Sequence, residues 1–253
     1  MREVVCLSRL TFLQGVRSRV FYTLLFFAAL LVLSTVVLNQ MTVGDPTKII
    51  QDVGLATVSF FTLLLILFVG SEVVGKDMET PAVFFILSKP ISRARYLLGR
   101  FLGLLGLLYA NMVAFTGIIL LILFLYSHTF KWVLFLSVGL TAIEMAILLS
   151  FLCLFFLFIS PTLTPFLVLA IFVIGHTTTE VREIFAHKEG IYHYVSIGLY
   201  YLFPNFDLLS VQTEVVHNVP IPILHLVYGC LYGIAFVVVV LWIAIWILNR
   251  KDF

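Results

Sequence analysis

The chain has 253 residues, of which 62% are hydrophobic and only 11% are charged, and its formal net charge at pH 7 is +2. Ordinary soluble domains are about half apolar and about a quarter charged, so this composition excludes that class. We therefore expect an all-α integral membrane protein. The three cysteines, Cys6, Cys153 and Cys230, lack the paired spacing of a disulfide framework or a zinc site, and we expect neither.

Residues 1–20 carry several arginines among apolar residues that gather on one side of a helical wheel. This pattern predicts an interfacial helix at the membrane surface. A basic leader that only sets the orientation of the first span explains the same arginines equally well.

Two apolar runs then follow, 21–38 and 53–74, each long enough to cross a hydrocarbon core about 30 Å thick.

The stretch that joins the second and third spans contains the signals of a short helix. Thr80 and Pro81 are typical of a helix start, because the Thr oxygen accepts an orphan backbone N–H and Pro needs no donor at the first helical position. Pro90 ends the helix. We predict a short, mostly apolar helix at 77–90 outside the membrane, where it needs a protein partner. The flanking charges are expected to anchor this loop: Glu72, Arg93 and Arg95.

Four more apolar runs complete a six-span arrangement, at 96–126, 132–159, 164–181 and 223–248. The third span begins with Gly99, Gly103 and Gly106. Small residues three and four positions apart let a neighbouring helix approach closely, although glycine is frequent in membrane helices for other reasons too.

The fifth run is the shortest. From Thr164 to Gly175 it has about a dozen residues, too few to cross the core at roughly 1.5 Å per residue. Either the helix continues from Thr177 to Val181, or the run is re-entrant. Residues 182–222 then form an extracytoplasmic segment with an aromatic-rich piece, which suits a re-entrant or interfacial position.

Basic residues predict the orientation of the six spans. Most of the 15 Lys and Arg residues fall in the N-terminal segment, the loop between spans two and three, and the C-terminus. These three regions should face the cytoplasm. The six histidines then lie outside or at outer span ends without the i, i+4 spacing of a zinc site, so we expect surface histidines. A transient metal or pH-sensing role is the alternative.

Several catalytic motifs are missing from the sequence. There is no GxxxxGK[ST] phosphate loop, no HExxH and no GxSxG. An ATP-driven cycle would therefore need a second polypeptide, and the chain is not expected to be an enzyme by itself. An intramembrane enzyme has no motif in its favour, and no cofactor is expected on this chain.

Glu144 stands near the middle of the fourth span, where an ionisable group costs several kcal/mol unless it is protonated, paired or facing water. One interpretation is a transport site. The other is a protonated carboxyl that holds helices together through a hydrogen bond to Asn111, Thr116 or another neighbour.

The region from 70 to 103 resembles the signature of ABC-transporter type-2 permeases, in particular the NosY-like group. That pattern has a Glu at the end of the second span, a short helix ending in LLS-x-P-[IV]-S-R, and a Gly-Lys or Gly-Arg entering the third span. Here it reads Glu72, then residues 87–93 as LSKPISR, then Gly99 and Arg100. The FPNFDLL piece at 203–209 and the C-terminal NRKDF extend the similarity. Glu79-Thr80-Pro81 departs from the family's usual Gly-Thr, which affects where the short helix begins.

The resemblance implies the membrane subunit of an ABC exporter in a bacterial or archaeal plasma membrane, with both termini cytoplasmic. The short helix would be a cytoplasmic coupling helix that docks on a separate ABC-type ATPase subunit, which binds ATP and Mg. Two copies of each subunit would assemble, with no nucleic acid, and an extracytoplasmic accessory protein is a further partner that the resemblance allows. The implied ATPase contacts are Val83, Phe84, Phe85, Ile86, Leu87, Ser88 and Lys89.

Two alternatives remain open on the residues alone. An ATP-independent carrier or channel would use Glu144 as its proton or ion site. A NosY-like permease would instead serve the maturation of an extracytoplasmic metalloenzyme. The apolar spans suit an amphipathic or lipid-like cargo better than a free ion, but lipid-facing surfaces have the same composition.

Overall fold

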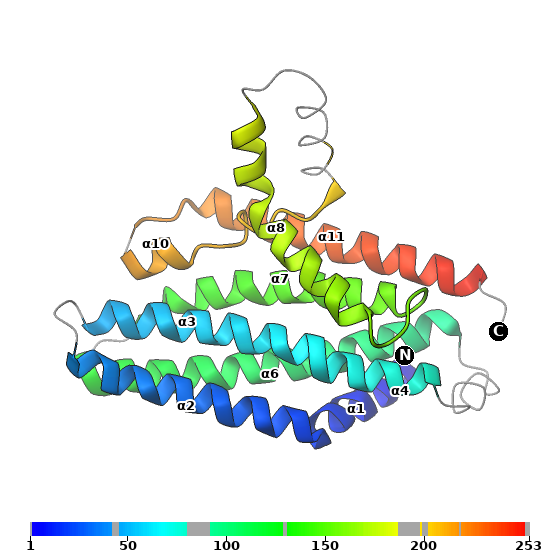
Figure 1. Cartoon of the computed structure of the whole chain (residues 1–253), viewed down its shortest axis with the longest axis horizontal. Helices are drawn as coiled ribbons and strands as arrows, with labels where there is room; N and C mark the ends of the chain where they lie inside the picture. Colours follow the sequence, from blue (N-terminus) through cyan, green and yellow to red (C-terminus); the bar gives the residue numbers. More distant parts are fainter. Residues whose placement is uncertain are drawn as a thin grey trace.

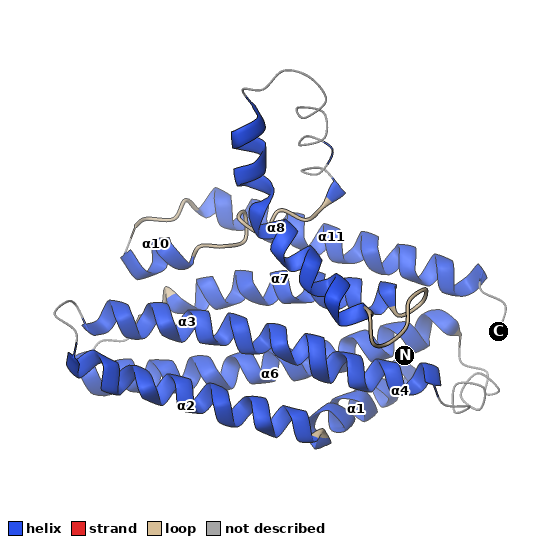
Figure 2. Cartoon of the chain, in the orientation of Figure 1, coloured by secondary structure: helices blue, strands red, loops and turns tan. Residues whose placement is uncertain are grey.

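The computed structural model describes residues 2–41, 46–79, 92–128, 131–186, 198, 202–217 and 219–250. Every regular element in these ranges is a helix, and none is a strand (Figure 2). The elements are α1 (Arg2–Arg17), α2 (Arg19–Met41), α3 (Pro46–Leu64), the π-helix η1 (Leu65–Gly70), α4 (Ser71–Glu79), α6 (Arg93–Ser127), α7 (Leu134–Phe155), α8 (Thr164–Ala186), α10 (Gln212–His217) and α11 (Ile223–Arg250).

The described residues contain five helical stretches long and apolar enough to cross a membrane, and a sixth if the bent pair of α1 and α2 counts as one span. This agrees with the expectation of an all-α, multi-pass membrane protein. The five stretches are Thr47–Gly75, Arg93–Leu125, Leu134–Phe155, Thr164–Ile184 and Ile223–Arg250.

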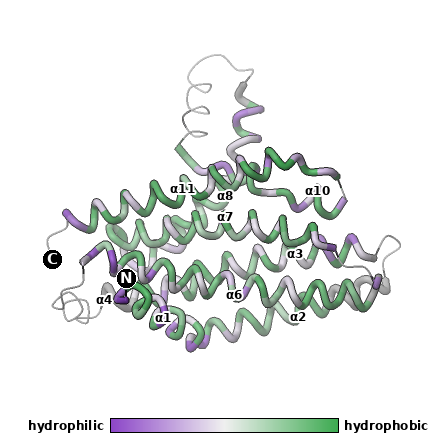
Figure 3. The backbone as a smooth tube through the Cα atoms, turned by 180° about the vertical axis from the view of Figure 1, so that it is seen from behind, coloured by the Kyte–Doolittle hydropathy of each residue, from purple (hydrophilic) through white to green (hydrophobic). Residues whose placement is uncertain are grey.

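Most of the long helices lie side by side along the longest axis of the molecule (Figure 1). α1 begins at the end of the bundle where α4 and α11 end and α6 begins, whereas α10 lies at the opposite end. Hydrophobic residues line the middle of the long helices, and hydrophilic ones gather toward their ends (Figure 3). Three regions that the sequence assigns to the cytoplasmic side thus meet at one end of the bundle.

α1 packs along the first half of α6, and the glycines of α6 allow the contact. A Cβ atom on Gly103 would lie 2.5 Å from the carbonyl oxygen of Ser8, and one on Gly99 would lie 2.7 Å from the side chain of Leu7. The prediction that another helix approaches these glycines closely is confirmed, and that helix is α1. At Ser18 the chain then bends by 62° into α2.

The second predicted span continues without a break through α3, η1 and α4, from Pro46 to Glu79. η1 is buried and packs against α7 and α8. Of the short helix predicted at 77–90, the first three residues belong to α4. Residues 80–90, with all seven implied ATPase contacts, lie outside the described residues.

α8 is one helix that runs from Thr164 past Val181 to Ala186. Its first half lies along the bundle, whereas its C-terminal turns stand away from it (Figure 1). The chain returns at 202–209, and this returning segment packs against the middle of α8.

Candidate functional site

Glu144 lies at the middle of α7, the most completely enclosed part of the bundle. Every residue from Glu144 to Ser150 is buried, because α3, α6, α8 and α11 all pack on α7. The side chain of Glu144 is only 6% exposed. A carboxyl group at this position needs a polar partner or a proton, since an isolated charge in a low-dielectric interior costs several kcal/mol.

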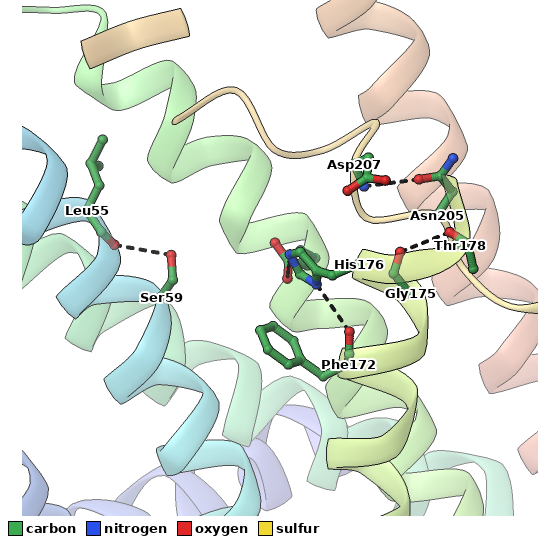
Figure 4. Close-up of polar contacts among 9 residues, drawn as sticks. Leu55, Ser59, Phe172, Gly175, His176, Thr178, Asn205 and Asp207 are labelled. Carbon is green, nitrogen blue, oxygen red and sulfur yellow. Dashed lines mark hydrogen bonds and ion pairs between the residues drawn. The ribbon is translucent and has the colours of Figure 1, made fainter. Parts of the chain in front are cut away.

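His176 on α8 is the partner that the structure supplies. Its Nε2 lies 3.6 Å from Oε1 of Glu144, which is within ion-pair range but longer than a hydrogen bond. Its Nδ1 lies 3.1 Å from the carbonyl oxygen of Phe172, one turn earlier on the same helix (Figure 4). The imidazole ring stands between the rings of Phe172 and Phe206, with centroid separations of 4.6 and 5.4 Å.

The contact with Phe172 assigns one proton of the imidazole ring. The carbonyl oxygen of Phe172 can only accept, so Nδ1 of His176 must be the donor. Nε2 is the ring nitrogen that faces Glu144.

The 202–209 segment packs against α8 beside this site. The backbone N–H of Phe206 donates to the carbonyl oxygen of Gly175 at 3.1 Å. A Cβ atom on residue 175 would lie 2.8 Å from the carbonyl oxygen of Pro204 and would also collide with the ring of Phe206. Phe206 and Leu209 are completely buried. Glycine at 175 is therefore what lets the segment dock.

Asn205 fixes the shape of the docked segment. Its side-chain Oδ1 accepts from the backbone N–H of Asp207 at 3.0 Å (Figure 4) and from the Thr179 hydroxyl at 3.4 Å. Its own backbone N–H donates to the hydroxyl oxygen of Tyr232 on α11 at 2.9 Å. The segment that follows α8 is thus tied to both α8 and α11.

The sequence suggested Asn111 and Thr116 as hydrogen-bond partners of Glu144, but the structure gives them different contacts. The Thr116 hydroxyl donates to the backbone carbonyl of Met112 on its own helix. Nδ2 of Asn111 is buried and has no hydrogen-bond partner among the described residues. The partner shown for Glu144 is neither of these but His176, a residue that the sequence placed with surface and interfacial histidines.

The three predicted anchor residues each contact a different part of the chain. Glu72 accepts a hydrogen bond of 2.6 Å from the hydroxyl of Ser18, at the bend between α1 and α2. Arg93 donates to the carbonyl oxygen of Leu248 on α11 at 2.9 Å. Arg95 pairs with Glu3 on α1 at 2.9 Å. These contacts connect the helices on either side of the 80–91 stretch to the bend at Ser18, to α11 and to α1.

Arg100 has a structural role that its place in the signature motif did not indicate. It is buried, and its Nη1 donates to Thr11 at 3.1 Å and to Gln14 at 2.5 Å, so it joins α6 to α1. A second missed feature is the G-x-x-x-G spacing of Gly229 and Gly233, where α11 crosses α7 against Leu140 and Ile143. That spacing is a known signal of close helix packing in membranes.

No group of three His, Cys, Asp or Glu side chains within the described ranges is arranged to hold a metal ion. In comparisons with known proteins, no protein-family model and no curated protein matches this chain.

Proposed function

We propose that this chain is the membrane-spanning permease subunit of an ABC exporter, which couples ATP hydrolysis by a separate ATPase subunit to the export of a substrate. The observation that carries the proposal is the signature-like stretch from Glu72 to Arg100, whose two ends are fastened to Ser18 at the bend, to α11 and to α1. A loop that transmits force must be tied at both ends to the elements that it moves.

In this proposal the helix at 77–90 is the coupling helix, and the end of the bundle that holds it faces the cytoplasm. Arginines of α1, of the start of α6 and of the end of α11 all lie at that end, as the positive-inside rule expects. Both termini are then cytoplasmic. Two permeases assemble with two ATPases, and ATP and Mg bind to the ATPases.

The transmission path in the proposal is the continuous α3–η1–α4 rod. Closure of the ATPases moves the coupling helix, and α4 carries this displacement into η1, which packs against α7 and α8. α7 and α8 contribute Glu144 and His176, and α8 holds the 202–209 segment. A movement at the cytoplasmic end therefore reaches the 202–209 segment, which in this proposal is part of the outer gate.

The test is co-purification of the ATPase with a tagged copy expressed in its native host. Phe84→Asp and Phe85→Asp place a charge on the predicted docking face, and each should abolish recovery of the ATPase. Ser92→Asp is the matched control, because it adds the same charge next to the loop at an exposed position and should leave recovery unchanged. Full recovery with both Phe variants would contradict the coupling-helix assignment.

A second candidate is an ATP-independent carrier or channel, and the buried Glu144–His176 pair is the observation that favours it. A proton held between two helices at mid-bundle is what a proton-linked carrier requires. Liposomes that contain only this chain and a pH-sensitive dye should then show proton flux under an imposed potential, and Glu144→Gln should stop it. An absence of flux in the wild-type protein excludes this candidate as a proton channel.

A further inference from the structure

The bend between α1 and α2 borders a cavity of about 640 Å³ that none of the functions above uses. Among the described residues its polar lining is Gln14, Arg17, Ser18, Arg19 and Glu72, and Val20 and Val73 also line it. We propose that this bend cavity binds the headgroup of an aminophospholipid, with the phosphate held by the two arginines and the amine by the carboxylate. The inference needs only a chain in a bilayer and does not depend on the transport proposal.

The floor of the bend cavity is fixed by buried contacts. Ser18 is buried and donates to Glu72 at 2.6 Å, so the carboxylate is held at the bend. Gln14, which also lines the cavity, accepts from the buried Arg100 at 2.5 Å, which fixes the position of its amide. A site whose polar groups are already oriented loses little conformational entropy on binding.

The charges in the bend cavity match a zwitterion with a phosphate. Arg17 and Arg19 are both exposed, and a guanidinium presents a planar fork of donors that suits phosphate oxygens. Glu72 would repel a simple anion. A headgroup that carries a primary amine beside its phosphate would instead be attracted, because its ammonium group is opposite in charge to the Glu72 carboxylate. A carboxylate can accept several hydrogen bonds, so the one from Ser18 does not prevent this contact.

An apolar stripe on α2 leads away from the bend cavity and distinguishes a lipid from a free phosphate. Tyr22, Phe26, Leu30 and Leu33 are exposed at spacings of four, four and three residues, so they follow one face of the helix. Arg19 lies one turn before Tyr22 on that face. A lipid whose headgroup sits at Arg19 can therefore lay an acyl chain along the stripe.

The experiment is native mass spectrometry of the full-length chain in detergent, titrated separately with phosphatidylethanolamine, phosphatidylglycerol and inorganic phosphate. The wild-type protein should retain phosphatidylethanolamine at least five-fold better than phosphatidylglycerol, and millimolar phosphate should not displace it. Arg17→Ala/Arg19→Ala should lower the retained phosphatidylethanolamine at least five-fold. Arg2→Ala/Arg9→Ala is the control, because it removes two exposed charges from α1 outside the bend cavity and should change little.

Glu72→Gln tests the amine separately, because it should remove the preference for phosphatidylethanolamine over phosphatidylglycerol while retention of phosphatidylglycerol persists. If Arg17→Ala/Arg19→Ala fails to fold, Arg17→Lys/Arg19→Lys keeps the charge and should weaken binding by a smaller factor. Equal retention by the alanine pair and its control would overturn the site. Displacement by phosphate, or a wild-type preference for phosphatidylglycerol, would overturn the assignment to an aminophospholipid.

Discussion

At the end of the bundle where α1 begins, Arg95 and Glu3 pair at 2.9 Å with 52% and 42% of their side chains exposed. At mid-bundle Glu144 is 6% exposed, and its partner His176, 34% exposed, lies 3.6 Å away. The shorter pair is the weaker one, because water screens both of its charges in the free and the paired state. In the longer pair the Glu144 carboxyl is shielded from water, so it is costly without a partner or a proton. Burial, more than separation, decides how much a polar contact matters in this chain.

Breaking the buried pair should have the largest effect. His176→Ala removes the imidazole and leaves a cavity beside the Glu144 carboxyl, which then has no polar partner from α8. We expect the free energy of unfolding to fall by about 3–5 kcal/mol. The measurement is unfolding of the purified protein in mixed detergent micelles.

The double variant Glu144→Gln/His176→Ala is the control for this prediction. It leaves no ionisable group at the site, so it should recover a large part of the lost stability. Strictly additive losses for the two substitutions would show that the residues do not act as a pair.

The docked 202–209 segment provides an intermediate test, since it encloses the same site. Gly175→Ala places a methyl group against the carbonyl oxygen of Pro204 and the ring of Phe206, and overpacking of this kind costs about 1–3 kcal/mol. Gly139→Ala on α7 is the matched control, because nothing lies within 4 Å of the added Cβ. It should be neutral or slightly stabilising in the same assay. Equal destabilisation by both variants would mean that the effect does not come from contact with the docked segment.

The exposed pair should give the smallest effect. Arg95→Ala removes one partner from a half-exposed ion pair, for which about 0.2–1 kcal/mol is typical. The difference from the wild-type protein should shrink as salt is raised to about 1 M, where the Debye length is about 3 Å. A loss above 2 kcal/mol that salt does not change would place Arg95 among the structural residues, beside the buried Arg100.

The helices themselves could be predicted because apolar runs of sufficient length leave few other structures for a chain in a bilayer. The contact at Gly99 and Gly103 was also predictable, since small residues mark a close approach, although the sequence did not identify α1 as the partner. The pairing of Glu144 with His176 was not predictable. It depends on how α7 and α8 are rotated about their axes and on the docking of Phe206, and neither is encoded in local spacing. The second glycine pair, Gly229 and Gly233, did carry a readable signal.

The π-helical turn of η1 gives the long rod an adjustable register. A π turn contains one residue more than the α-helical turn that it replaces, because its hydrogen bonds run from i to i+5. If η1 tightens into α-helix, everything beyond Gly70 must advance by one residue, which rotates α4 by roughly 100° and shifts it by about 1.5 Å. Such a rotation carries Glu72 away from the Ser18 hydroxyl that now holds it. In the proposed transmission path, the α3–η1–α4 rod could therefore rotate about its own axis as well as shift along it. The hydrogen bond between Ser18 and Glu72 holds α4 in its present orientation.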